Sequence, residues 1–128
     1  MIEHKLPVHA YANFFEHLKP EDLQRFDSIF SASVHFKDPF NDVHGLVAIK
    51  SVFSHMFEQC KDPRFTVLDV CQSEDRAYLS WDFDFFLKGR PGEQRIHGLS
   101  RVSFDSNGLV TEHIDYWDPA AQVYAKLP

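Results

Sequence analysis

The stretch VHFKDPFNDVHGLVAIKSVFSHMF, residues 34–57, indicates the fold more clearly than any other part of the chain. Its second half has apolar residues at helical i, i+3, i+4 spacing, which predicts a helix over residues 45–60. Its first half alternates, which predicts an extended segment that breaks at Pro39. Because a proline disfavours the helical conformation of the residue before it, Asp38 is held extended. Asp38 places a carboxylate in an otherwise apolar row of residues, and this position requires a structural or functional explanation.

Two interpretations of Asp38 remain open at this stage. In the first, its carboxylate projects into an apolar cavity and serves a function there, so Asp38→Asn leaves stability unchanged or raises it. In the second, the carboxylate caps the turn formed by Pro39 to Asn41, and the same change costs roughly 1 kcal/mol or more. We expect stability to hold.

The rest of the chain predicts helices first and strands afterwards. Two helices are predicted before residues 34–57, which we call the organising stretch. The first spans residues 7–19, and the second is short, begins at a proline and spans residues 20–30. A turn at Lys61 to Pro63 leads into alternating segments at residues 64–72, 76–87, 95–104 and 109–117. Asp118 and Pro119 open a last short helix that includes Ala120, Ala121, Val123 and Tyr124. The order predicts one α+β domain over residues 1–128, with helices against a curved antiparallel meander.

Composition narrows the function classes. The net charge of −6 and the lack of a basic run argue against a nucleic-acid partner. Cys60 and Cys71 have no metal-ligand spacing, and no histidine pair has HxxxH or HxH spacing, so no metal and no cofactor are expected. Without a signal core or a membrane-length apolar run, we expect a soluble cytoplasmic protein. The 13 phenylalanines indicate that apolar side chains form the walls of a wide pocket as well as a packed core.

Several local patterns resemble the cone-shaped family that includes nuclear transport factor 2, ketosteroid isomerase and SnoaL-like cyclases. They are Phe30, then Val34-x-Phe36-x-Asp38-Pro39, then Gly45-x-x-x-Ile49, and near the end Phe104-Asp105-x-x-Gly108-Leu109-Val110 with Asp115-Tyr116-Trp117-Asp118. The resemblance covers essentially the whole chain. It implies a cone-shaped curved antiparallel sheet wrapped around three N-terminal helices, followed by a short C-terminal helix.

The resemblance to ketosteroid isomerase extends to only one of the three functional positions. Asp38 falls on its general base, but the oxyanion tyrosine falls on Phe14 and the protonated aspartate near Ser100. We therefore expect no appreciable isomerisation of 3-keto-Δ5 steroids. Tyr11, one helical turn before Phe14, is the nearest hydroxyl.

SnoaL-type cyclases, in contrast, carry an acid-base aspartate on the final strand. The same resemblance implies that His113, Asp115 and Trp117 point into a cavity lined by the inner face of the sheet. Ile114 and Tyr116 would then point outward. A slip of one residue would reverse every side chain, so the opposite register is the main alternative.

Two function classes follow. The first is a cofactor-free acid-base enzyme of the isomerase, cyclase, dehydratase or hydrolase type, acting on a small hydrophobic molecule with Asp38, His113 and Asp115. The second is a non-catalytic ligand-binding or dimeric interaction module. The expected ligand-binding residues are Tyr11, Phe14, Phe15, Phe36, Val52, Met56, Trp81, Phe83, Phe85, Ser100, Val102 and Trp117. A homodimer through the outer face of the sheet is expected from the apolar area of Leu79, Leu99, Arg101 and Tyr116.

Overall fold

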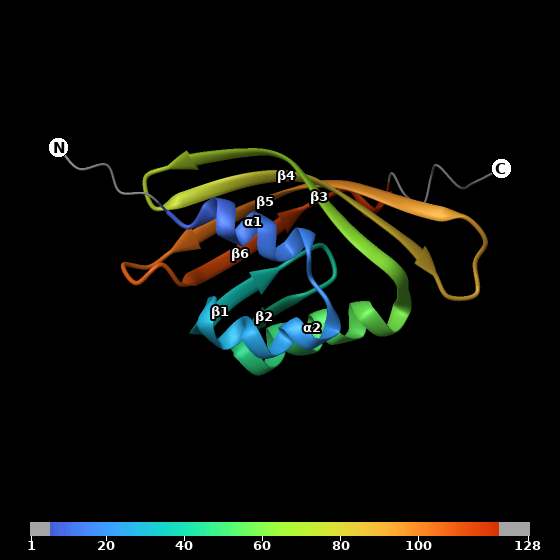
Figure 1. Cartoon of the computed structure of the whole chain (residues 1–128), viewed down its shortest axis with the longest axis horizontal. Coiled ribbons are helices and arrows are strands. Elements are labelled where there is room, and N and C mark those ends of the chain that lie inside the picture. The colour runs from blue at the N-terminus through green and yellow to red at the C-terminus, as the bar shows by residue number, and fades with distance from the viewer. Residues whose placement is uncertain (1–5, 121–128) are drawn as a thin grey trace.

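Helices precede most of the strands along the chain, as Figure 1 shows for the computed structural model, which describes residues 6–120. The elements are α1 (Val8–Glu16), the 3₁₀ helix η1 (Pro20–Ser28), β1 (Phe30–Lys37), β2 (Asp42–His44), α2 (Leu46–Gln59), β3 (Cys60–Ser73), β4 (Arg76–Leu87), β5 (Glu93–Phe104) and β6 (Val110–Tyr116). The α+β class and the curved sheet around helices are confirmed. None of the described helices has the length and apolar character needed to cross a membrane.

Within residues 6–120 the sheet has six strands, in the order β2-β1-β6-β5-β4-β3. The predicted meander is confirmed, because β3 to β6 pair antiparallel with their neighbours in turn. A departure from the expected antiparallel sheet lies between β1 and β6, which run parallel. Parallel strands need a long connection, and the chain from α2 through β5 supplies it. This pairing joins the first and the last strand along the chain within the sheet.

Strand alternation decides which side chains face the helices. In β4 the residues Ala77, Leu79, Trp81, Phe83 and Phe85 are all buried, as a period of two requires. The expectation that Leu79 belongs to the outer face is therefore wrong, because it shares the parity of Trp81.

Three local expectations need correction or completion. The segment after Pro20 forms a 3₁₀ helix that ends at Ser28, so Phe30 opens a strand. The loop after Pro39 contains the short strand β2. Lys61 to Pro63 form no turn: β3 begins directly after α2, and an irregular register with a positive φ of 51° at Asp62 absorbs the change.

The predicted last helix lies mostly outside the described residues, which include neither Ala121, Val123 nor Tyr124. Within them, the carboxylate of Asp118 accepts a hydrogen bond from the Ala120 N–H at 2.9 Å. This is the contact of an N-cap.

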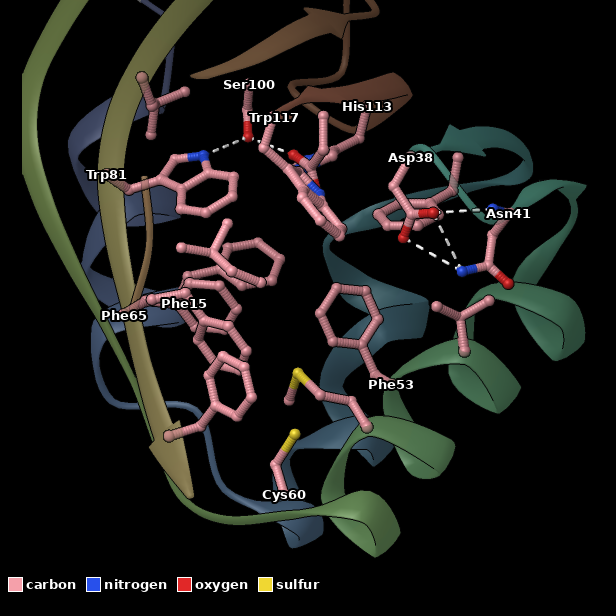
Figure 2. Close-up of a pocket in the computed structure, with 18 of the residues that line it drawn as sticks. Phe15, Asp38, Asn41, Phe53, Cys60, Phe65, Trp81, Ser100, His113 and Trp117 are labelled. Carbon is pink, nitrogen blue, oxygen red and sulfur yellow. Dashed lines mark hydrogen bonds and ion pairs between the residues drawn. The ribbon is translucent and has the colours of Figure 1, made fainter. Parts of the chain in front are cut away.

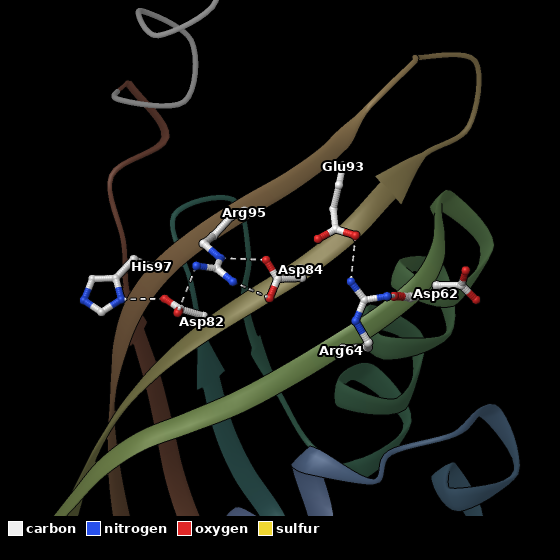
Figure 3. A network of polar contacts seen from close by, with 7 residues as sticks. All are labelled: Asp62, Arg64, Asp82, Asp84, Glu93, Arg95 and His97. Atoms are coloured by element: carbon white, nitrogen blue, oxygen red, sulfur yellow. Dashed lines mark hydrogen bonds and ion pairs between the residues drawn. The ribbon is translucent and has the colours of Figure 1, made fainter.

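The outer face of β4 and β5 is charged (Figure 3). Arg95 donates to both carboxylate oxygens of Asp84, at 2.7 and 3.2 Å, and the Nδ1 of His97 lies 2.9 Å from Asp82. The hydrogen bond from Arg95 holds the pKa of the Asp84 carboxyl below its ordinary value. Asp84 is buried on this face because the Arg95 side chain is paired over it.

Candidate functional site

A cavity of about 290 Å³ lies between the inner face of the sheet and the helices α1 and α2. Most of the expected ligand-binding residues line it, namely Tyr11, Phe15, Phe36, Val52, Met56, Trp81, Phe83, Phe85, Ser100 and Trp117. Asp38, His113 and Asp115 line it as well. Figure 2 shows aromatic side chains from strands and helices facing one another across this space.

Phe14 and Val102 do not line the cavity. Both are buried, and Phe14 packs against Phe26 with ring centroids 5.8 Å apart, under the guanidinium of Arg25. On α1, Tyr11 and Phe15 turn toward the cavity, whereas Phe14 turns toward η1. The expected ligand contacts of Phe14 and Val102 thus become core packing.

A line of hydrogen bonds crosses the polar end of the cavity. The Nε2 of His113 lies 2.7 Å from Oδ1 of Asp115, and the hydroxyl of Ser100 donates to the same oxygen. The indole N–H of Trp81 donates to the Ser100 Oγ at 2.8 Å. Because His113 and Asp115 are two residues apart in β6, they share one face, and Asp115 lies opposite Ser100 in β5. The structure therefore has the inward register for His113 and Asp115.

Tyr11 completes this line from α1. Its hydroxyl lies 2.6 Å from the Nδ1 of His113, and the ring of Phe36 stacks on the imidazole at 5.3 Å. Since the Asp115 carboxylate accepts at Nε2, we assign the imidazole proton to Nε2, and Tyr11 then donates to Nδ1. Burial, reinforced by the charge of Asp115, raises the pKa of Tyr11 well above its ordinary value. Tyr11 thus remains a hydroxyl.

Asp38 is engaged with its own loop. Its Oδ1 accepts from the backbone N–H groups of Phe40 and Asn41 at 2.8 and 2.7 Å. The Asn41 amide donates to both carboxylate oxygens at 3.0 and 3.1 Å (Figure 2). The carboxylate therefore caps the turn and also borders the cavity. Its four bonds tie the loop that carries Phe40, whose ring meets Trp117 edge-on at 5.4 Å.

The cavity also has walls that the sequence analysis did not assign to it. They are Phe40, Asn41, Phe53, His55, Cys60, Phe65, Val67, Leu79 and Ile96. The period of two in β3 and β4 was sufficient to place Phe65, Val67 and Leu79 inward. Cys60 lies where α2 becomes β3, and burial raises the pKa of its thiol.

Most of the chain matches a known domain family. Residues 11–113 match the SnoaL-like domain. The chain belongs to the SnoaL-like domain family. The match contains both cavity-facing residues of α1, the Asp38 loop and His113, and it ends two residues before Asp115. No curated protein matches the chain.

Several solved structures share this fold over most of their length. A hypothetical protein from Catenulispora acidiphila with a ketosteroid isomerase-like fold, in complex with trimethylamine, has a TM-score of 0.79 and 16% identity over 97% of this chain and 96% of that one. A putative SnoaL-like polyketide cyclase from Jannaschia has a TM-score of 0.79 and 13% identity, over 98% and 99% of the chains.

An LEH-like epoxide hydrolase from M. tuberculosis has a TM-score of 0.72 and 14% identity, over 91% of this chain and 79% of that one. At these identities the likeness concerns the fold alone. The nuclear transport factor 2-like and ketosteroid isomerase-like character of the fold is thereby confirmed.

Proposed function

We propose that this SnoaL-like protein binds a small hydrophobic molecule in the cavity and carries out acid-base chemistry on it without a cofactor. The observation that supports this most is the position of Asp115. Its carboxylate borders an otherwise largely aromatic cavity while one of its oxygens is held by His113 and Ser100. A polar group in a fixed orientation at the end of an apolar chamber is the arrangement expected of a binding or active site.

In this proposal Asp115 takes a proton from a carbon of the substrate and returns it to another atom of the same molecule. Its Oδ1 accepts from His113 and Ser100, whereas among residues 6–120 no hydrogen bond reaches Oδ2. The free oxygen is thus available to a ligand, and the two bonds on its partner oxygen restrict its orientation. His113 and Ser100 act as positioning groups. Asp38, with four bonds from its own loop, has a positioning role in place of the base role.

The type of substrate follows from the donors. The N–H of Trp81, the O–H of Ser100, the N–H of His113 and the O–H of Tyr11 each have an acceptor inside the network. No member is left over to stabilise a developing oxyanion, and each such donor is worth on the order of 3 kcal/mol. This favours substrates whose conjugate base is already delocalised, such as 1,3-dicarbonyl compounds. It also supports the expectation that 3-keto-Δ5 steroids are not isomerised.

The test uses the conversion between the keto and enol forms of 1-phenyl-1,3-butanedione, followed by ultraviolet absorbance. The parent should accelerate the conversion, and Asp115→Asn should lose at least about a hundredfold in rate, as expected for removal of a general base. Binding of the same compound, measured by quenching of tryptophan fluorescence, should persist in the variant. Asp82→Asn, on the outer face, is the matched control and should keep the parent rate.

Equal rates for the parent and Asp115→Asn would overturn the assigned base. Binding without any acceleration by the parent would instead favour the second candidate, a non-catalytic ligand-binding module. The observation that favours this candidate is that each donor of the network between Tyr11 and Trp81 already has an acceptor within it. Native mass spectrometry that finds a hydrophobic molecule co-purifying with the parent and released unchanged would support it.

A further inference from the structure

We propose that the outer face of the β1–β2 hairpin binds a divalent transition-metal ion such as Zn²⁺ through His35, Asp42 and His44. The nitrogen and oxygen atoms that each of these residues can offer lie within 4.8 Å of one another. This site is independent of the cavity, because the neighbouring Phe36 faces the cavity while His35 faces the opposite side of the same strand.

Strand pairing brings the three residues together. His35 in β1 lies directly opposite His44 in β2. Asp42 precedes His44 by two residues, so the two side chains leave the same face of β2. The expectation of no metal rested on histidine spacings within a single helix or strand. His35 and His44 are nine positions apart and lie on two strands, so these spacings do not include them. The short strand β2, predicted as loop, creates the juxtaposition.

The three ligand atoms are near enough to one another to share a single ion after side-chain rotation. The imidazole rings of His35 and His44 stack in parallel, with centroids 4.4 Å apart, and the Nε2 of His35 lies 2.6 Å from Oδ1 of Asp42. Zinc is bound at about 2.0–2.2 Å by histidine nitrogens and carboxylate oxygens. Side-chain rotation is needed to tilt the rings toward one ion. Such rotation is open to His44 and Asp42, which are both exposed.

Glu112 in β6 supports the site from the other side of His35. Its Oε2 lies 3.4 Å from the Nδ1 of His35, while its Oε1 accepts from Arg101 at 3.1 Å. A carboxylate on the second ring nitrogen of a ligating histidine fixes the tautomer and the ring orientation, and removing such a partner typically costs 10–100-fold in metal affinity. A proton on Nδ1, held by Glu112, leaves the lone pair of Nε2 to the ion, which then replaces the contact between Nε2 and Asp42.

The ligand set selects the kind of ion. Imidazole nitrogen suits zinc, copper, nickel and iron, whereas magnesium and calcium take oxygen ligands. Two histidines and one carboxylate supply three of the four positions of a zinc site and leave the last to water. Calcium should therefore not compete.

The experiment is calorimetric titration of the untagged full chain with Zn²⁺, with affinity and stoichiometry as readouts. The parent should bind one ion per chain. His44→Gln and Asp42→Asn should each lose at least about tenfold in affinity, and Glu112→Gln should lose about tenfold or more. His97→Gln is the matched control, because it removes a histidine that also pairs with an aspartate on the outer face of the sheet, at 2.9 Å. Its affinity should equal that of the parent.

Three results would overturn the site. They are no zinc binding by the parent, parent-like affinity in His44→Gln, and half an ion per chain with zinc-dependent dimerisation in sedimentation. His35→Gln should match His44→Gln, and since His44 is exposed, its replacement tests the site even if His35→Gln does not fold.

Discussion

The indole ring of Trp81 lies directly over Gly98, its partner on the neighbouring strand β5. A Cβ added at Gly98 would be 2.5 Å from the nearest indole atom, which is closer than real contacts allow. The glycine therefore gives the ring the space from which its N–H reaches Ser100 at 2.8 Å. One hydrogen atom in place of a side chain thus sets the position of a cavity wall.

Gly98→Ala should displace the Trp81 ring and weaken its bond to Ser100. Overpacking of this kind typically costs 1–3 kcal/mol, so the free energy of unfolding in denaturant should fall by about that much. In a Trp81→Phe background, which removes the clashing part of the indole, the cost should shrink toward zero. A full cost in both backgrounds would contradict the clash as its cause.

Asp38→Asn should lower the free energy of unfolding by about 1 kcal/mol, because an amide cannot reproduce the four bonds that the carboxylate accepts. This reverses the expectation from the sequence, which favoured unchanged stability. The measurement is the denaturant midpoint at neutral pH. Asp38→Ala should cost at least as much. An unchanged midpoint in both variants would mean that the cap contributes nothing to stability.

Tyr11→Phe should lose about 1–3 kcal/mol of stability at neutral pH, because the buried Nδ1 of His113 is left without its donor. The folded protein raises the pKa of Tyr11 above the ordinary value of 10.0. Its contribution is therefore complete below pH 10 and declines above it, where the unfolded chain ionises first. Unfolding measured from pH 7 to 11 should show the gap between parent and variant narrowing above pH 10. Tyr116→Phe, on the exposed outer face, controls for removal of a tyrosine hydroxyl.

Asp84→Asn should lower the denaturation midpoint at pH 7 but not in acid. The bond from Arg95 holds the pKa of Asp84 below the ordinary 3.8, so the stability that it contributes is present above pH 3.8 and is lost as the pH falls through the lowered pKa. The test compares the midpoints of parent and variant at pH 7 and near pH 2. In an Arg95→Gln background the effect of Asp84→Asn should largely disappear, and an equal loss at both pH values would count against the ion pair.

A homodimer through the outer face of the sheet remains a prediction. Leu99 and Tyr116 are paired across β5 and β6 and are 40% and 50% exposed. Leu99→Asp should convert a dimer into a monomer in sedimentation at high micromolar concentration. Leu68→Asp, which replaces an exposed leucine of β3, is the control and should leave the dimer intact. A monomeric parent would remove the idea.

Local periodicity in the sequence determined most of the architecture. The helix of the organising stretch, the bounds of β4 and the shared face of His113 and Asp115 follow from repeats of 3.6 and 2 residues. Such repeats depend on neighbours in the chain, so they can be seen without knowledge of the fold. The same rule was sufficient to place Leu79 inward, although the outer face was expected for it.

The tertiary structure alone decided the contacts between residues that are distant in sequence. Three contacts depend on which strands become neighbours. They are the pairing of β1 with β6, the packing of Trp81 on Gly98 and the contact of His35 with His44. Asp38 shows the limit within a short loop as well, because the proline fixed its backbone but not the donors that its carboxylate would find. The sequence pattern states the direction of a side chain, whereas its partners depend on how the rest of the chain closes around it.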